Sequence, residues 1–227
     1  MEKPMFKMTN GRTAELFDLS HTLAAPLLAG TVYPHEVLPL LSDFIMELGK
    51  RLPSSFREIS ENVWAHESVK IAPSATLIGP AILCAGCELR PGAYLRGSVL
   101  VGENAVIGNS TEVKNAILFD RVAVPHFNYV GDSVLGFGAH LGAGAVISNV
   151  RADKAPVLLH FSDGDLPTGR KKVGAMVGDG AEIGCHAVLC PGTVLGKNVT
   201  VYPLSMVRGV IPAGCIFKRP GEMVPKH

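Results

Sequence analysis

The residue types that could do chemistry in this 227-residue chain gather between positions 90 and 172. They are mainly cations, joined by a histidine that lies near a carboxylate-containing stretch. The set consists of Arg90, Arg96, Glu112, Lys114, His126, Tyr129, His140, Asn149, Lys154 and residues 170–172. Guanidinium and ammonium groups suit an anionic ligand such as a phosphate, and a histidine suits a general base near neutral pH. An isolated Arg or Lys is usually a solvated surface charge, so this interpretation requires that the fold bring these residues together.

A six-residue repeat sets the elements that must position them. An aliphatic residue recurs at every sixth position from Ile71 to Val113, and Phe119 closes this run. A second run extends from Val177 to Val207, and a short run at 135–147 lies between them. Neither a helical period of 3.6 nor the alternation of a strand explains one apolar residue in six. Three hexads per coil, each a short strand and a corner, make a parallel β-helix. The sequence therefore predicts an all-β solenoid, a parallel β-helix of hexapeptide repeats.

Two interruptions of the repeat are candidates for function. Residues 151–172 form a polar, charged insertion, and long loops that leave a rigid scaffold often carry binding residues. The step from Phe119 to Leu135 is 16 residues, which is not a multiple of six. It predicts an irregular patch at residues 125–133, and departures from a local rule tend to mark functional sites.

Residues 1–62 lack the repeat. Apolar residues follow helical spacing over 13–28 and 35–52, with Pro26, Gly30 and Pro34 between them, which predicts a helical hairpin. The expected organisation is an N-terminal helical segment at 1–62, a β-helix at 63–219 with its insertion at 151–172, and a tail at 220–227.

Composition excludes several classes. A formal net charge of +1 gives no reason to expect a nucleic-acid partner. No apolar stretch approaches the roughly 20 residues of a membrane span, and the first residues lack the apolar core of a signal peptide. Five cysteines, an odd number, favour a reducing cytoplasm over a disulfide framework. Cys84 and Cys87 have the spacing of a redox or zinc pair, but no second pair stands at a zinc-site distance, and structural packing is the favoured interpretation.

Four segments follow one another with fixed gaps: LRPGA at 89–93, IGNSTEVK at 107–114, HFNYVGDS at 126–133 and LGAG at 141–144. Together they resemble the acetyltransferase domain of the bifunctional glucosamine-1-phosphate acetyltransferase/N-acetylglucosamine-1-phosphate uridyltransferases. The segment TGRKKVG at 168–174 is more similar to the archaeal-type sugar-1-phosphate nucleotidyltransferase/acetyltransferases. The resemblance covers about residues 63–219 and implies a left-handed β-helix. Residues 1–62 are too short for the α/β nucleotidyltransferase domain of these enzymes, so nucleotide activation is not expected.

The resemblance also implies roles for individual residues. Arg90 and Lys114 would bind the phosphate, and Tyr129 would contact the sugar phosphate. His126 would be the catalytic base, with Glu112 orienting it. Asn149, counted with the catalytic residues, and Lys154 would lie at the sugar site. Ala143 would offer its backbone N–H to the thioester carbonyl, and Ala143, Cys185 and Arg219 would bind acetyl-CoA. Two positions depart from the family pattern: His140 replaces a sugar-binding Asn, and Cys185 replaces a serine.

The expected reaction is acetyl-CoA-dependent N-acetylation of an amino-sugar 1-phosphate, with glucosamine-1-phosphate the expected substrate. The amine would attack the thioester directly, without a metal or a cofactor other than acetyl-CoA as cosubstrate. Because a single prism offers no concave pocket, a homotrimer with clefts between neighbouring walls is expected. One alternative is a non-catalytic trimeric scaffold or regulatory subunit. Another is a γ-type carbonic anhydrase, which needs three zinc-binding histidines, two of them about five residues apart; His126, His140, His160 and His186 are spaced by 14, 20 and 26 residues.

Overall fold

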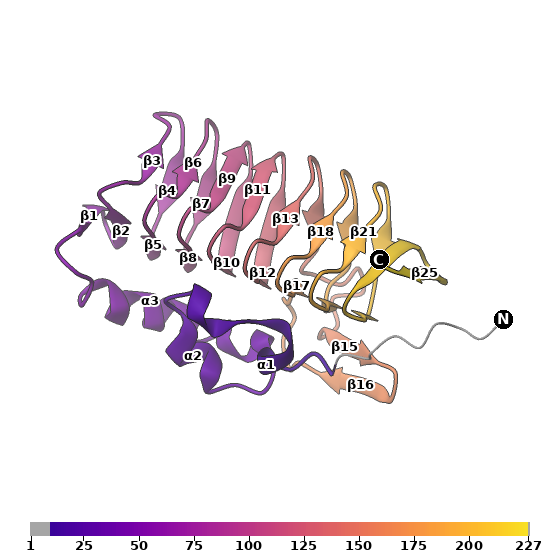
Figure 1. Cartoon of the computed structure of the whole chain (residues 1–227). Helices are drawn as coiled ribbons and strands as arrows, with labels where there is room; N and C mark the ends of the chain where they lie inside the picture. Colours follow the sequence, from indigo (N-terminus) through magenta and orange to yellow (C-terminus); the bar gives the residue numbers. More distant parts are fainter. Residues whose placement is uncertain (1–9, 227) are drawn as a thin grey trace.

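The chain forms one long solenoid of short parallel strands with helices along one side (Figure 1). The computed structural model describes residues 10–226. The first nine residues of the predicted N-terminal segment and the last residue of the predicted tail lie outside the described residues. Strands of successive coils lie directly on one another, as when Ile71 pairs with Leu89 and Leu89 with Ile107. The parallel β-helix predicted from the hexads is confirmed.

Each coil contributes one strand to each of three walls. The first wall contains β2 (Val63–His66), β5 (Ala81–Leu83), β8 (Val99–Val101), the second halves of β10 (Glu112–Leu118) and β12 (Tyr129–Leu135), β17 (Ala175–Val177), β20 (Thr193–Leu195) and β23 (Val210–Ile211). The second wall contains β3 (Lys70–Ile71), β6 (Glu88–Leu89), β9 (Val106–Asn109), β11 (Ala123–His126), β13 (His140–Leu141), β18 (Glu182–Ile183), β21 (Thr200–Val201) and β24 (Cys215–Arg219). The third wall contains β4 (Thr76–Ile78), β7 (Tyr94–Arg96), the first halves of β10 and β12, β14 (Val146–Ile147), β19 (Val188–Leu189) and β22 (Met206–Val207).

The repeating aliphatic residues fill the interior of the prism. Leu95, Val101, Ile107 and Val113 are all fully buried. Burying a side chain of this size contributes about 1.5–3 kcal/mol, so the stacked columns of identical positions are the main source of the coil's stability.

Two coils are one residue shorter than the rest, and this corrects the predicted phase. Leu118 pairs with Val101 and Leu135 pairs with Leu118, so both steps are 17 residues. The repeat position is therefore Leu118, and the assignment of Phe119 was wrong by one residue. The missing residue lies in the corners at Asn115 and Asp132, which turn with φ of 45° and 50°.

The predicted irregular patch at residues 125–133 contains one of these two corners, the one at Asp132. The rest of the patch is regular, because Ala123–His126 and the first half of β12 pair in register with the coils on both sides. The other shortened corner, at Asn115, lies before the patch and was missed from the sequence.

The N-terminal segment folds as several short helices. They are α1 (Thr13–Leu16), η1 (Leu19–His21), α2 (Ala25–Ala29), η2 (Pro34–Val37) and α3 (Leu41–Gly49). The first long helix predicted is broken because Phe17 and Thr22 are extended and Asp18 caps η1 by accepting from Ser20 N–H. In the second, Pro39, which lacks an N–H donor, separates η2 from α3. The predicted helical hairpin was therefore wrong in its two continuous helices, although the segment is helical.

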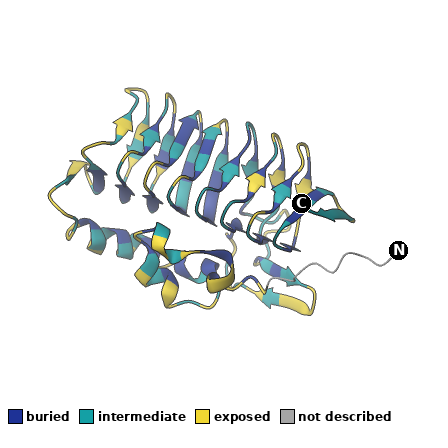
Figure 2. Ribbon diagram, in the orientation of Figure 1, coloured by how far each residue is buried: buried dark blue, intermediate teal, exposed yellow. Residues whose placement is uncertain are grey.

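These helices cover the first wall (Figure 2). The outward position is apolar and fully buried in six of the eight first-wall strands, where Ile82, Leu100, Ile117, Val134, Met176 and Val194 occupy it. The equivalent outward residues of the second wall are often polar, as with Glu88 and His140. Contacts such as Phe17 on Phe119, with ring centroids 5.1 Å apart, fasten the segment. One wall is thus closed by the chain itself, and two remain available.

Antiparallel strands at both ends correct two predicted boundaries. Strand β1 (Phe56–Ser60), inside the predicted helical segment, pairs with β2. Strand β25 (Glu222–Pro225), inside the predicted tail, pairs with β24. The insertion at 151–172 contains a hairpin of β15 (Leu158–Phe161) and β16 (Gly164–Pro167). Exposed edges of a solenoid would template pairing with other chains, and the end strands cover part of them.

Cys84 and Cys87 support the packing interpretation. Both thiols are buried and neither is in a disulfide. Burial raises the pKa of Cys84 far above its usual value and that of Cys87 to about 12, so both thiols stay protonated and poorly reactive.

Candidate functional site

The corner between the second and third walls brings His126, Ala143 and Cys185 into one column. Gly144 N–H donates to His126 C=O at 3.0 Å, and His186 N–H donates to Ala143 C=O at 2.9 Å. These bonds stack the three corners directly, one coil above the next. The predicted base and two of the predicted acetyl-CoA residues therefore lie along one edge of the prism.

Asn128 holds this edge together, and the sequence interpretation assigned it no role. Its side chain is buried and accepts from His126 N–H at 3.0 Å. Its amide group donates to Gly142 C=O at 2.8 Å and to Ala145 C=O at 3.0 Å. In most coils a small residue such as Ala145 or Ala187 fills this inward corner. An asparagine at this position is therefore the sequence feature that could have identified Asn128 as a structural residue of the site. Asn128 fixes the backbone of the His126 corner to that of the Ala143 corner.

The His126 imidazole is exposed to solvent, and within residues 10–226 it makes no hydrogen bond. Its predicted partner, Glu112, lies on the third wall, where its carboxylate accepts from Arg96 Nε at 2.8 Å. The described part of one protomer therefore does not join Glu112 to His126. The Ala143 backbone N–H is likewise without a hydrogen bond in the described residues. This edge consequently presents one free imidazole and one free amide donor.

The opposite edge of the third wall contains a buried carboxylate, Asp132, with 3 % of its surface exposed. Lys114 Nζ lies 3.1 Å from Asp132 Oδ2, and Asn115 Nδ2 donates to Asp132 Oδ1 at 2.8 Å. Asn149 Nδ2 donates to Asp132 Oδ2 and also to Tyr129 Oη at 3.3 Å. A buried carboxylate is costly unless it is paired and hydrogen-bonded, and here four polar side chains form a connected network. We call these residues, Lys114, Asn115, Tyr129, Asp132 and Asn149, the Asp132 cluster.

The cluster changes the interpretation of two predicted residues. Asn149 is buried and uses its amide group on Asp132 and Tyr129, so it positions other side chains instead of offering this group to a ligand. The pKa of Tyr129 is raised by burial and by the nearby Glu112 carboxylate, so its phenol stays protonated. Asp132 itself was not singled out from the sequence, because a buried acid at a corner has no periodic signature.

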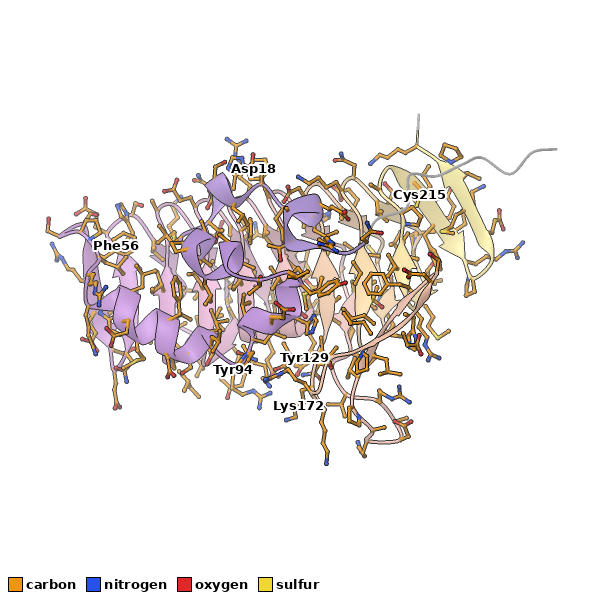
Figure 3. The ribbon with its side chains drawn as sticks, turned by 90° about the horizontal axis from the view of Figure 1, so that it is seen from below. Asp18, Phe56, Tyr94, Tyr129, Lys172 and Cys215 are labelled. Carbon is orange, nitrogen blue, oxygen red and sulfur yellow. The ribbon has the colours of Figure 1, made fainter. Side chains whose placement is uncertain are left out.

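The cation in line with Lys114 is Arg96, whereas Arg90 lies elsewhere. Strands β7 and β10 pair Tyr94 with Glu112 and Leu95 with Val113, which places Arg96 next to Lys114 on the same wall. Arg90 follows the second-wall strand β6, and its Nε bonds Glu88 at 3.2 Å. The third wall therefore separates Arg90 from Lys114. In Figure 3 the labelled Tyr94 and Tyr129 lie along one edge of the solenoid, close to Lys172 of the insertion.

The remaining predicted residues are spread out. His140 Nδ1 bonds Glu182 Oε2 at 2.8 Å on the second wall. Arg219 is exposed at the end of β24 and bonds Glu222 at 2.7 Å. Lys154 is exposed in the turn that opens the insertion. Among residues 10–226 no three His, Cys, Asp or Glu side chains are arranged to hold a metal ion, so one protomer supplies no ligand set for the carbonic anhydrase alternative.

No helix in the described part of the chain has the length and apolar character needed to cross a membrane. The described helices instead belong to the segment that covers the first wall.

Comparison with known proteins gives sequence relatives among bifunctional proteins. The chain is 34% identical over 128 residues to a bifunctional sugar-1-phosphate nucleotidylyltransferase/acetyltransferase of Sulfurisphaera tokodaii, covering 56% of this chain and 32% of that protein. It is 31% identical over 195 residues to the bifunctional protein GlmU of Methanococcus maripaludis, covering 85% of this chain and 47% of that protein. The chain thus spans between a third and a half of these relatives. No family model matches it.

Two solved structures align with most of the chain at low sequence identity. The polySia-specific acetyltransferase NeuO aligns at a TM-score of 0.44 and 12% identity, covering 70% of this chain and 82% of that one. A variant of the Bacillus cereus N-acyltransferase AntD, with dTDP-4-amino-4,6-dideoxyglucose and coenzyme A, aligns at 0.42 and 16% identity, covering 76% and 90%. By sequence, the chain is homologous to part of the bifunctional protein GlmU over 85% of its length and to part of the bifunctional sugar-1-phosphate nucleotidylyltransferase/acetyltransferase over 56%.

Proposed function

We propose that this protein transfers the acetyl group of acetyl-CoA to the amine of an amino-sugar 1-phosphate, with glucosamine-1-phosphate the expected substrate. The observation that carries the proposal is the arrangement of the third wall. One edge presents the Lys114 ammonium, held by Asp132, and the other presents the free His126 imidazole. A sugar phosphate lying across this wall would place its phosphate by the cation and its amine by the base.

The reaction needs only groups that the wall provides. His126 accepts a proton from the sugar amine as the amine nitrogen bonds the thioester carbon. The C–S bond then breaks, and the imidazolium returns the proton to the departing thiolate, giving an N-acetyl sugar phosphate and coenzyme A. General-base help of this kind is worth about 10²–10⁴-fold. The free Ala143 N–H is placed one coil from His126, where it would stabilise the oxyanion on the thioester carbonyl.

A trimer forms part of the proposal, because the wall is open to solvent in one protomer. Apolar side chains lie exposed on and beside the third wall towards its C-terminal end, with Val188 39 %, Met206 56 % and Leu204 82 % exposed. A neighbouring protomer packed there would bury these side chains and turn the flat wall into a cleft. A trimeric mass by light scattering at micromolar concentration would support this arrangement. A monomeric mass in the presence of both substrates would contradict it.

The decisive test is release of coenzyme A thiol from acetyl-CoA against a panel of amino sugars, amino-sugar 1-phosphates and sugar 1-phosphates without an amine. The proposal requires thiol release only when amine and phosphate are present together. Release with unphosphorylated amino sugars at equal efficiency would remove the phosphate role of Lys114. No release with any member of the panel would favour the non-catalytic scaffold.

A further inference from the structure

A second cleft lies outside the proposed active site, between the β15–β16 hairpin and the corners that follow β19 and β22. Its volume is about 360 Å³, at the lower end of the range of about 300–1,000 Å³ for small-molecule sites. Its lining includes Arg151, Asp153, Leu158, His160, Cys190 and Arg208, and we call this space the hairpin cleft. An adjoining hollow on the far side of the His160–Arg208 contact is lined by these two residues as well.

The hairpin that roofs the cleft is fixed to the solenoid. Val157 and Leu159 are buried, and β15 contacts the solenoid strands β20 and β23. Leu158 C=O approaches Gly192 so closely that a Cβ on Gly192 would lie 2.5 Å from the oxygen. The glycine, which also turns with φ of +77°, permits this contact. The cleft is therefore a built space between two packed elements.

One side of the cleft presents a guanidinium positioned by a histidine. His160 Nδ1 lies 2.7 Å from Asp165 Oδ1 across the hairpin, and Arg208 Nη2 lies 3.0 Å from His160 Nε2. A guanidinium can only donate, so Nε2 accepts and the Nδ1–H donates to Asp165, which fixes a neutral imidazole. Within residues 10–226 no carboxylate lies within ion-pair distance of Arg208. Its positive charge is therefore held in place and not neutralised by a neighbour.

Across the same cleft lies a second fixed guanidinium. Arg151 is held by Asp153 through bonds of 2.9 Å and 2.6 Å. The Cys190 thiol adds no negative charge, because burial raises its pKa. The lining therefore carries two guanidinium groups and the carboxylate of Asp153, and the Asp165 carboxylate is bonded to the lining through His160. Guanidinium groups are the preferred partners of phosphate oxygens, which they bind through parallel N–H bonds.

We propose that the hairpin cleft binds a phosphate-type anion, with Arg208 as the principal contact and His160 as the residue that positions it. The proposal does not depend on the acetyltransferase activity. Two sources of the anion are compatible with the cleft: a phosphate group of a substrate or cosubstrate, or free phosphate acting on the hairpin.

The test uses inorganic phosphate as the probe, measured by isothermal titration calorimetry of the full chain in a phosphate-free buffer. Lys114→Ala is introduced first, together with Asp132→Asn, so that a phosphate at the proposed active site does not contribute and no unpaired charge remains buried. In this background Arg208→Gln is expected to weaken phosphate binding at least tenfold. The matched control, Arg57→Gln on the exposed strand β1, is expected to leave binding unchanged. Equal phosphate affinity with and without Arg208→Gln would overturn the proposal, as would the absence of any binding in the Lys114→Ala, Asp132→Asn protein.

A second pair of variants separates positioning from folding. His160→Gln keeps an acceptor for Arg208 and is expected to retain most of the phosphate affinity, whereas His160→Leu is expected to lose it with an unchanged melting temperature. Equal losses from both would contradict the positioning role. Competition then identifies the source. If coenzyme A displaces phosphate and 3′-dephospho-coenzyme A does not, the anion is the 3′-phosphate of the cosubstrate. If a sugar 1-phosphate displaces phosphate, the anion is the phosphate of that substrate. Competition by neither would assign the cleft to free phosphate.

Discussion

The ammonium of Lys114 lies 3.1 Å from a carboxylate oxygen of Asp132 and so links the two shortened corners of neighbouring coils. The Lys114 side chain is 16 % exposed and that of Asp132 is 4 % exposed. The lysine can therefore reach a ligand at the surface, while the aspartate behind it is reached only by other side chains. The corner irregularity and the placement of this cation are one structural feature.

We predict a strong energetic coupling between these two residues. Lys114→Met leaves the Asp132 charge buried with only amide donors and should destabilise the fold by about 3–5 kcal/mol. Asp132→Asn should cost less, because the freed lysine can reach solvent. The double variant should lose less than the sum of the single variants, as measured by urea unfolding. Additive losses would show that the pair is not an interacting unit.

Two arginines test where the phosphate of the proposed substrate binds. Arg96 lies beside Lys114 on the third wall, and Arg90 lies on the second wall with Glu88. Charge-assisted bonds are worth about 1.5–3 kcal/mol, so Arg96→Ala and Lys114→Ala should each raise the KM for the sugar phosphate roughly tenfold or more. The KM for acetyl-CoA should change little. A larger effect from Arg90→Ala than from Arg96→Ala would move the phosphate to the second wall, as the resemblance implies.

The proposed base is tested by His126→Ala, which should lower kcat by at least about a hundredfold without changing the oligomeric state. Because Glu112 is bonded to Arg96 in the protomer, Glu112→Gln should give a smaller loss. A pH profile alone would not identify the base, since the substrate amine titrates in the same direction. Near-normal kcat in His126→Ala would assign proton removal to solvent or to His140, and the His126/His140 double variant separates these.

His35 should make the fold less stable in mild acid. Its side chain is buried, Nδ1 has no hydrogen-bond partner, and burial lowers its pKa, with Arg170 acting in the same direction and Glu36 opposing. The unfolded chain therefore binds a proton on His35 more readily than the folded protein does. The free energy of unfolding is unaffected by His35 above the pKa of an unfolded histidine, about 6.5, and it decreases as the pH drops below that value. The urea midpoint should decrease between about pH 7.5 and pH 5.5, and His35→Phe should reduce this decrease. His186→Gln, at an exposed site, is the control, and an unchanged slope in His35→Phe would contradict the assignment.

Gly49 should be essential for docking α3 on the first wall. A Cβ at this position would lie 2.4 Å from the ring of Trp64, which is 8 % exposed. Gly49→Ala therefore forces the indole or the helix to shift and should destabilise the protein by about 1–3 kcal/mol. Gly30→Ala is the matched control, because the nearest atom to its Cβ would be 3.6 Å away. Trp64 is the single tryptophan of the chain, so its fluorescence reports the change directly.

The coil and much of the candidate wall could be predicted from the sequence for a specific physical reason. Each short strand of the coil must bury one aliphatic side chain inside the prism. The six-residue period of these side chains therefore determines the fold. The same period puts Ala143 and Cys185 at equivalent corners, each two residues after an aliphatic residue of the repeat. His126 lies 17 residues before Ala143 and joins their edge only because the coil between them is one residue shorter.

Tertiary structure alone decided the rest. Asp132 gains its role from Lys114, Asn115 and Asn149, which lie 17 or 18 residues away and meet it only because the coils stack. Arg96, and not Arg90, neighbours Lys114 because strand register, not motif similarity, sets which side chains are adjacent. A periodic sequence specifies each position of a coil, whereas contacts between coils depend on register, and a single missing residue in a corner changes them.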